Sequence, residues 1–407
     1  MGTTRSKNEF QPLHKAFPEM KILCVHSGAD LYGASRCLLR NCKKLSEDGH
    51  SVHIMLPCDG PLLSSLENLK LSVEIPKTLS LLTRDPLRSP WGILCLLTGM
   101  IKSSFYLSCV IKKFRPDIIH SNTATIFLFS GLAAKWHRVK HIWHIREFFT
   151  EFGPLWNIYK WIVYALSDEI WTVSSAVAEQ FTPNRLQRKV RVVHDGFPQE
   201  EFQSVSESRI TDFRTKYQLG NGPLIGIVGR IKFQRKGQEI FVQAAAELKE
   251  QYPQIRYVII GSPFPGNEDH LDKLTELIDA LDVKSIVTYT GDVGDVKAAY
   301  SSLDISVLAS ALPEPFGGVV IESMFLGKPV VGTRIGGTIE QIDDGKTGIL
   351  VNPGDPEDLA RALRTFLDNP ERMRAMGKNG KEKVLREYEF EKIYVQMLDA
   401  YRGVLKS

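Results

Sequence analysis

Short apolar runs typical of strands alternate with longer stretches of helical pattern along nearly the whole chain. Runs such as Lys21–His26 and Leu224–Val228 are rich in Ile, Val and Leu, as strands of a parallel sheet buried on both faces are. This alternation predicts an α/β protein. At 407 residues with 43% hydrophobic content, the chain is too long for one ordinary core, so we expect two domains.

The expected strands form two parallel sheets, each wrapped by helices. The first half of the chain supplies strands at 21–26, 51–56, 117–120, 141–144, 169–173 and 190–194, and the second half supplies strands at 224–228, 256–260, 286–289, 305–308, 330–333 and 348–351. The polar stretch Gln199–Gly222 between them is the natural linker. We therefore expect a tail at 1–19, domains at 20–198 and 223–385 joined by residues 199–222, and a C-terminal helical segment at 386–407.

Residues 314–322 read Glu-Pro-Phe-Gly-Gly-Val-Val-Ile-Glu and lie between a strand pattern and a helix pattern. Gly317 and Gly318 let a ligand approach the backbone, and the amides of the first helical turn favour a phosphate. Glu314 in the loop can accept sugar hydroxyls, and Glu322 inside the helix can reach a ribose. The segment predicts a sugar-nucleotide site, although an ordinary turn followed by an exposed helix has the same residues.

A second polar cluster follows the expected strand Leu224–Val228. Gly229 and Arg230 end that strand, and Lys236 and Gly237 precede a helix expected over 238–251. Arg offers a forked donor and Lys a point charge, so together they can hold a diphosphate and neutralise it as it leaves. Open α/β sheets bind ligands at the carboxyl ends of their strands, which favours this interpretation over a solvated charged loop.

With these motifs, the chain resembles the retaining glycosyltransferases of family 4, also called glycosyl transferases group 1. The resemblance runs from Met20 onward and rests on Gly229-Arg230 with Lys236-Gly237, on Gly291-Asp292-Val293, and on residues 314–322, 327–332 and 336–337. It implies the GT-B fold, with two Rossmann-like domains whose parallel sheets face each other across a cleft. It also implies an acceptor-binding N-terminal domain, a C-terminal domain that binds the nucleotide sugar, and a last helix that packs back on the first domain.

The resemblance also assigns residues to the site. Catalytic roles fall to His144, Arg230, Lys236 and Glu314, and donor binding falls to Gly33, Gly229, Val293, Phe316, Gly317, Gly318, Val319, Val320 and Glu322. Two positions depart from the family pattern: a single glycine, Gly33, stands where a double glycine is usual, and the acid after His144 arrives three residues late, as Glu147. Two alternative interpretations remain: Gly33 could lie in a strand-to-helix turn that binds no ligand, and His144 could have a purely structural role. Asp195-Gly196 favours a turn, so we expect a hinge there.

Charge is distributed unevenly along the chain. Residues 1–195 hold 25 Lys and Arg against 16 Asp and Glu, a net of +9, although the whole chain carries only +4. A basic acceptor domain is drawn to an anionic membrane surface, a lipid diphosphate or an acidic glycan, and no nucleic-acid-reading motif accompanies the charge. The apolar segment from Trp91 is interrupted by Lys102, so neither piece reaches the ~20 residues of a membrane span. We expect amphipathic helices there, either peripheral to a membrane or packed in the core.

Cysteine and acidic residues place few further constraints. The six cysteines all lie in the first half with no Cys-x-x-Cys pair, which favours reduced thiols in a cytoplasmic protein. Residues 1–19 lack the apolar core of a secretory signal. No Asp-x-Asp sequence is present, so we expect no metal and no cofactor, the nucleoside diphosphate sugar being a substrate.

The resemblance, together with these features, implies an enzyme, a retaining, metal-independent hexosyltransferase. It would move a sugar from a UDP- or GDP-sugar to a hydroxyl on a glycan or lipid-linked intermediate of cell-surface polysaccharide synthesis, in the cytoplasm or at the inner face of a membrane. Two alternatives remain at this stage. One is a GT-B epimerase or phosphorylase, and the other is a catalytically silent subunit that binds a sugar nucleotide.

Overall fold

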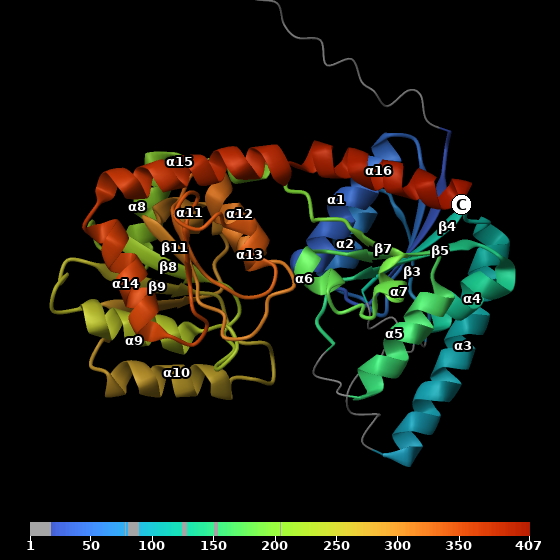
Figure 1. The fold of residues 1–407 in the computed structure, drawn as a ribbon, viewed down its shortest axis with the longest axis horizontal. Coiled ribbons are helices and arrows are strands. Elements are labelled where there is room, and N and C mark those ends of the chain that lie inside the picture. Colours follow the sequence, from blue (N-terminus) through green and yellow to red (C-terminus); the bar gives the residue numbers. More distant parts are fainter. Residues whose placement is uncertain (1–17, 78, 80–88, 124–127, 150–153, 204) are drawn as a thin grey trace, which may run out of the picture. The chain divides into compact units, whose positions relative to one another are not determined.

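The computed structural model describes residues 18–77, 79, 89–123, 128–149, 154–203 and 205–407 (Figure 1). Residues 1–17 of the expected tail lie outside the described residues. The chain divides into two compact units. The first holds Met1–Ile145, Asn157–Ile170 and Tyr401–Ser407, and the second holds Arg146–Trp156 and Trp171–Ala400.

The first sheet has seven strands in the order β3-β2-β1-β4-β5-β6-β7. They are β1 (Lys21–His26), β2 (Ser51–Met55), β3 (Ser72–Glu74), β4 (Ile118–Asn122), β5 (Lys140–Ile145), β6 (Glu169–Thr172) and β7 (Val190–Val192). The pairings of β1 with β2 and β4, and of β4 with β5, are parallel. Six of these strands are the expected ones. Strand β3 was not expected, because its three residues, one exposed and two half-buried, form no apolar run.

Five helices accompany β1–β5. They are α1 (Gly33–Glu47), α2 (Pro61–Asn68), α3 (Pro90–Phe114), α4 (Phe129–His137) and α5 (Pro154–Leu166). Leu107 and Ile111 of α3 pack with Phe129 of α4 and with Val25 and Ile119 of the sheet. Lys102 interrupts the apolar run, as expected, but it does not interrupt the helix. Helix α3 is continuous over 25 residues, because Lys is a good helix former and Lys102 is exposed.

The second sheet has six strands in the order β10-β9-β8-β11-β12-β13. They are β8 (Leu224–Val228), β9 (Arg256–Ile260), β10 (Val287–Gly291), β11 (Ile305–Leu308), β12 (Val330–Thr333) and β13 (Ile349–Val351). All five pairings are parallel. The predicted α/β class with two parallel sheets is therefore confirmed.

The remaining elements run from α6 to the C-terminus. They are α6 (Ser175–Ala178), α7 (Asn184–Gln187), the 3-10 helix η4 (Gln199–Phe202), α8 (Glu207–Lys216), α9 (Gln238–Leu248), α10 (Asp269–Ala280), α11 (Val296–Ser302), α12 (Gly318–Phe325), α13 (Thr338–Gln341), α14 (Pro356–Leu367), α15 (Pro370–Glu387) and α16 (Phe390–Lys406). The stretch expected as a linker thus contains α8, and Arg214 of that helix donates to the Ser302 carbonyl oxygen at 2.6 Å.

Strand order determines where a ligand can approach the second sheet. From β8 the chain adds β9 and β10 on one side, and it then returns to add β11, β12 and β13 on the other. The loops that leave β8 and β11 therefore diverge at their carboxyl ends. Such a switch point is where open α/β sheets bind ligands. The loops after β8 and β11 carry Lys236 and Glu314 respectively.

Candidate active site at the carboxyl edge of the second sheet

The structure brings Lys236 and Glu314 together at the switch point. The Lys236 Nζ lies 2.7 Å from Oε1 of Glu314, and the Ser310 hydroxyl donates to the same oxygen at 2.6 Å. Glu314 is buried and Lys236 is about one-third exposed. A carboxylate held by a cation and a hydroxyl keeps one orientation, which suits a group that must position a ligand.

The loop after β8 is held against the loop after β11 by close backbone contact. Gly237 has φ +73°, and a Cβ there would lie 1.8 Å from the Ala309 carbonyl oxygen. The Ala311 amide donates to the Arg235 carbonyl oxygen at 2.9 Å. Only glycine permits this approach, so Gly237 sets the position from which Lys236 reaches Glu314.

The loop after β12 encloses Glu314 from another side. Gly336 has φ +61°, and a Cβ there would lie 2.4 Å from the Glu314 carbonyl oxygen. The Gly337 amide donates to that oxygen at 2.8 Å. The glycine pair 336–337 that the sequence marked as a family motif therefore packs directly on the backbone of Glu314.

Helix α12 begins next to this loop. Gly317 is its N-cap and provides no side-chain cap. The Gln341 side-chain amide lies 3.2 Å from both the amide nitrogen and the carbonyl oxygen of Gly317, so it can accept from one and donate to the other. Gly318 opens the helix, and its amide donates to the Phe316 carbonyl oxygen at 3.0 Å. The amides and dipole of the first turn favour an anion at this helix end.

Glu322 lies one turn into α12 and is half-buried. Its Oε2 accepts a hydrogen bond of 2.6 Å from the hydroxyl of Tyr300, a buried residue on α11. Tyr300 thus orients the carboxylate that the sequence suggested for ribose binding. No sequence pattern indicated a role for Tyr300, because its Ala-Ala-Tyr-Ser context is that of an ordinary helix.

Glycines with positive φ follow or end three adjacent strands. They are Gly229 after β8, Gly261 after β9 and Gly291 at the end of β10, and a Cβ on Gly261 would lie 2.2 Å from the Gly229 carbonyl oxygen. The Gly261 amide donates to the Gly291 carbonyl oxygen at 2.9 Å. The carboxyl edge is therefore lined by bare backbone on this side, and Val293 lies half-buried just beyond Gly291.

Arg230 directly follows Gly229. Its guanidinium lies over the ring of Phe264, 4.5 Å from the centroid. The Gln238 side chain donates to the Arg230 carbonyl oxygen at 2.9 Å. Arg230 is therefore oriented by Phe264 and Gln238, whereas Lys236 is oriented by Glu314. The structure thus gives the two predicted cations different partners.

The apolar members of the predicted set differ in burial. Val320 is fully buried, and Val319 is half-buried. Phe316 stacks on Phe197 at 6.2 Å and packs near Tyr388 at 5.8 Å. Phe316 and Val320 therefore support the loop and the helix start from inside the second unit.

The predicted residues of the first unit occupy separate strand ends. Gly33 opens α1 after β1, and no atom lies within 4 Å of where its Cβ would be. His144 lies near the end of β5, is 2% exposed and stacks on His120 with ring centroids 5.5 Å apart. The Tyr401 hydroxyl lies 2.5 Å from Nδ1 of His120. His144 is thus part of a packed aromatic cluster that reaches the last residues of the chain.

Asp195 has a partner that the sequence did not indicate. Nη1 of Arg146 lies 2.6 Å and 2.7 Å from its two carboxylate oxygens, and both side chains are buried. The expected hinge at Asp195-Gly196 therefore includes a buried ion pair within the second unit. Breaking such a pair leaves an uncompensated buried charge.

Glu340 forms a second charged contact nearby. Its Oε1 lies 3.5 Å from Nε2 of His194, and its Oε2 accepts from the Ser175 amide at 3.1 Å. Burial would raise the pKa of Glu340, but the nearby His194 imidazole and the hydrogen bond from the Ser175 amide outweigh it, so the pKa is lowered. The carboxylate is therefore ionised at neutral pH.

Within the described ranges, no group of three or more His, Cys, Asp or Glu side chains is placed to hold a metal ion. The six cysteines are free thiols. The groups that the structure places at the switch point are Arg230, Lys236, two carboxylates and the start of α12.

Solved structures define the class of fold. HepE from Anabaena, solved in complex with UDP, superposes with a TM-score of 0.81 at 22% identity, covering 94% of this chain and 100% of that one. A glycosyltransferase from Rickettsia africae gives a TM-score of 0.82 at 22% identity, covering 96% and 100%. The fold is therefore the GT-B fold of glycosyltransferases, as the sequence predicted.

Family models extend this to the sequence level. The model described as Glycosyltransferase Family 4 matches residues 32–201, and the model described as Glycosyl transferases group 1 matches residues 209–383. Together they span most of the chain, which belongs to the group 1, family 4 type of glycosyltransferases.

One curated relative is the sulfoquinovosyl transferase SQD2 of Arabidopsis thaliana. It is 30% identical over 292 residues, or 67% of this chain and 54% of that protein. The D-inositol 3-phosphate glycosyltransferase of Corynebacterium urealyticum is 31% identical over 221 residues, or 53% and 51%. The chain spans about half the length of these two relatives.

Proposed function

We propose that this chain is a retaining glycosyltransferase that moves a sugar from a nucleoside diphosphate donor to an acceptor hydroxyl. The observation that carries the proposal is the arrangement of Lys236, Glu314 and the start of α12 at one switch point, with Glu322 one turn inside that helix. At one edge of the sheet, a cation and helix amides can bind a diphosphate, and a carboxylate can bind the hydroxyls of a sugar.

Each part of the donor has a chemical partner in this arrangement. The diphosphate lies at the N-terminus of α12 with Arg230 and Lys236 as counter-charges. Glu322, oriented by Tyr300, accepts the ribose hydroxyls, and Glu314 accepts hydroxyls of the transferred sugar. Gly229, Gly317 and Gly318 leave room for the ligand to approach the backbone.

The reaction needs charge neutralisation more than a nucleophile. As the bond from the anomeric carbon to the diphosphate oxygen breaks, the electron pair goes to the diphosphate, where Arg230, Lys236 and the helix amides stabilise it. The acceptor oxygen attacks the same face of the sugar, and its proton passes to the departing phosphate oxygen. We propose that these groups act without a divalent metal or other cofactor.

The choice of nucleotide and acceptor forms the finer part of the proposal. UDP is the first candidate, because HepE is described in complexes with UDP and with UDP-glucose, and GDP is the second. We propose a glycan or lipid-linked acceptor of cell-surface polysaccharide synthesis, met in the cytoplasm at the inner face of a membrane. The net charge of +9 on residues 1–195 supports an anionic acceptor or surface.

The deciding experiment is a thermal-shift panel of UDP, GDP and their sugars, followed by product analysis with the sugar that stabilises most. Sugar transfer to a hydroxyl acceptor, with the donor's anomeric configuration kept, is the expected result. Conversion of the donor without acceptor would indicate an epimerase, and consumption of inorganic phosphate would indicate a phosphorylase. Binding with no turnover on any acceptor would indicate a silent subunit.

A further inference from the structure

Helix α3 exposes an unusual amount of apolar surface. Trp91, Leu94, Ile101 and Phe105 recur at three- to seven-residue spacing along one side, and Trp91 and Phe105 are 73% and 76% exposed. Helix α4, which packs on α3, adds Trp136, 84% exposed. Ten of the nineteen exposed large hydrophobic residues among those described lie on α3, α4 and α5.

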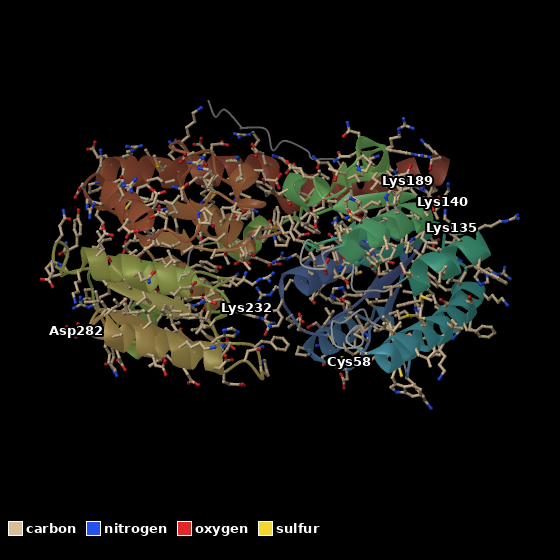
Figure 2. All side chains as sticks on the ribbon, turned by 60° about the horizontal axis from the view of Figure 1, so that its bottom comes forward. Cys58, Lys135, Lys140, Lys189, Lys232 and Asp282 are labelled. Atoms are coloured by element: carbon tan, nitrogen blue, oxygen red, sulfur yellow. The ribbon has the colours of Figure 1, made fainter. Side chains whose placement is uncertain are left out.

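The charge on this surface has one sign. The sequences of α3, α4 and α5 contain no Asp or Glu, whereas Lys102, Lys112 and Lys113 of α3 are exposed. Lys135 at the end of α4 and Lys140 at the start of β5, both labelled in Figure 2, share one carboxylate, that of Asp168, at 3.9 Å each. The surface therefore combines exposed aromatic rings with an excess of positive charge.

Helix α3 is long and apolar enough over Trp91–Phe114 to cross a membrane, and only 22% of its most apolar 18-residue window is buried. Its inner face argues against crossing, because Leu107, Val110 and Ile111 are buried in the core with α4 and the sheet. The N-terminal end of α3 extends beyond the other ribbons of the first unit (Figure 1). A helix whose inner face is packed in the core and whose outer apolar face is exposed is suited to lie in the plane of a membrane–water interface.

We propose that the outer face of α3, with Trp136 of α4, docks this chain on an anionic lipid bilayer. Trp91, Leu94, Ile101 and Phe105 insert among the acyl chains near the headgroups, and the Lys side chains reach anionic headgroups. A second copy of the chain is disfavoured as the occupant, because both faces would carry the same positive charge. This docking rests on the membrane contact included in the proposed function and assigns it to particular residues.

The test is co-sedimentation of the full chain with vesicles, without donor or acceptor. The chain should bind phosphatidylcholine vesicles containing about a third phosphatidylglycerol, and it should bind pure phosphatidylcholine vesicles much more weakly. The W91Q/F105Q variant should lower the partition coefficient by about tenfold or more. The K112E/K113E variant should lower it by about 25-fold or more, at roughly fivefold for each lost basic residue.

Matched controls lie on the second unit. V395Q removes an exposed apolar residue from α16, and K284E reverses a lysine that is 77% exposed, so both should bind vesicles like the parent. Circular dichroism checks that every variant is folded. Equal binding to both vesicle types, unchanged binding by the α3 variants, or a dimer that W91Q/F105Q dissociates in the absence of vesicle binding would each overturn the proposal. Vesicle binding requires no catalysis, so its failure is distinguishable from failure of sugar transfer.

Discussion

Lys236 and Glu314 are 78 residues apart in the sequence, yet Lys236 Nζ lies 2.7 Å from Oε1 of Glu314. Two glycine-dependent backbone contacts make this possible, one between Gly237 and Ala309 and one between Gly336 and Glu314. A cation that can serve a leaving diphosphate is thus already paired with the carboxylate assigned to the sugar. Under the proposed function, donor binding therefore shares Lys236 between the diphosphate and Glu314.

Replacement of Glu314 by Gln should act on turnover. The amide keeps the shape and the hydrogen bond from Ser310 but loses the charge that orients the sugar hydroxyls and Lys236. We expect kcat to fall by ~100-fold while affinity for the nucleoside diphosphate product changes little, because that product lacks the transferred sugar. Steady-state rates and product calorimetry measure the two effects. Equal losses in both would contradict the assignment.

Arg230→Ala and Lys236→Ala should each reduce turnover by ~100-fold or more, the scale expected when a preorganised counter-charge of the leaving group is lost. Lys232→Ala is the matched control, since Lys232 is an exposed cation in the same loop (Figure 2) and should keep near-parental rates. Each variant should keep the thermal unfolding profile of a folded protein. A folded Arg230→Ala or Lys236→Ala enzyme with normal turnover would remove that residue from the diphosphate site.

Glu322→Gln should weaken the donor and the nucleoside diphosphate product alike by ~1 to 3 kcal/mol, the cost of lost charged hydrogen bonds to the ribose. Tyr300→Phe removes only the hydroxyl that orients this carboxylate at 2.6 Å, so it should weaken both ligands by a smaller amount, about 1 kcal/mol. Isothermal calorimetry with UDP and GDP gives both values. Unchanged product affinity in Glu322→Gln would show that this glutamate does not contact the ribose.

Much of this fold follows from the sequence because the strands that matter most are buried on both faces. Leu224–Val228 and Ile305–Leu308 are continuous apolar runs with almost no exposed atoms, so their pattern is unambiguous. Strand β3 was not predicted because Ser72–Glu74 has three residues and a single apolar one, whereas the other edge strands, β7, β10 and β13, carry apolar runs and were predicted.

The candidate site divides in the same way. Residues within short motifs, such as Glu314 and Glu322, can be found from spacing alone. Spacing could not identify Tyr300 or the pair of Arg146 and Asp195, because each makes its contact with a residue distant in the sequence. It could not identify Ser310 either, because a serine in a loop is common. Tertiary packing determines which of these common residues contacts a motif residue. The local sequence pattern does not contain that information.

Chelation should leave activity largely intact. In the proposed mechanism, Arg230, Lys236 and the start of α12 supply the positive charge that neutralises the leaving diphosphate, without a divalent ion. Initial rates with and without EDTA, after dialysis against the chelator, provide the measurement. Loss of activity with EDTA that magnesium or manganese restores would overturn the metal-free mechanism.

The last prediction concerns acid stability and His141 of β5. This imidazole is fully buried, its Nδ1 donates to the Leu166 carbonyl oxygen at 2.9 Å, and its Nε2 lies 2.9 Å from the Ser121 hydroxyl. Burial lowers the pKa of His141 from 6.5 to about 4. Because the folded-state pKa lies below the unfolded-state value, the neutral ring contributes stability that is fully present above pH 6.5 and is lost as pH falls toward 4.

Between pH 7 and pH 5 the free energy of unfolding should therefore fall by about 2 kcal/mol through this residue. Tryptophan fluorescence during urea denaturation reports the transition, since all six Trp lie in the first half of the chain. His141→Gln removes the titrating ring. The free energy of unfolding of this variant should therefore depend less on pH between 7 and 5, whatever the effect of the substitution on stability at pH 7. His270→Gln, a half-exposed residue of the second unit, serves as the control and should keep the parental slope. A parental slope in His141→Gln would show that other groups govern acid stability.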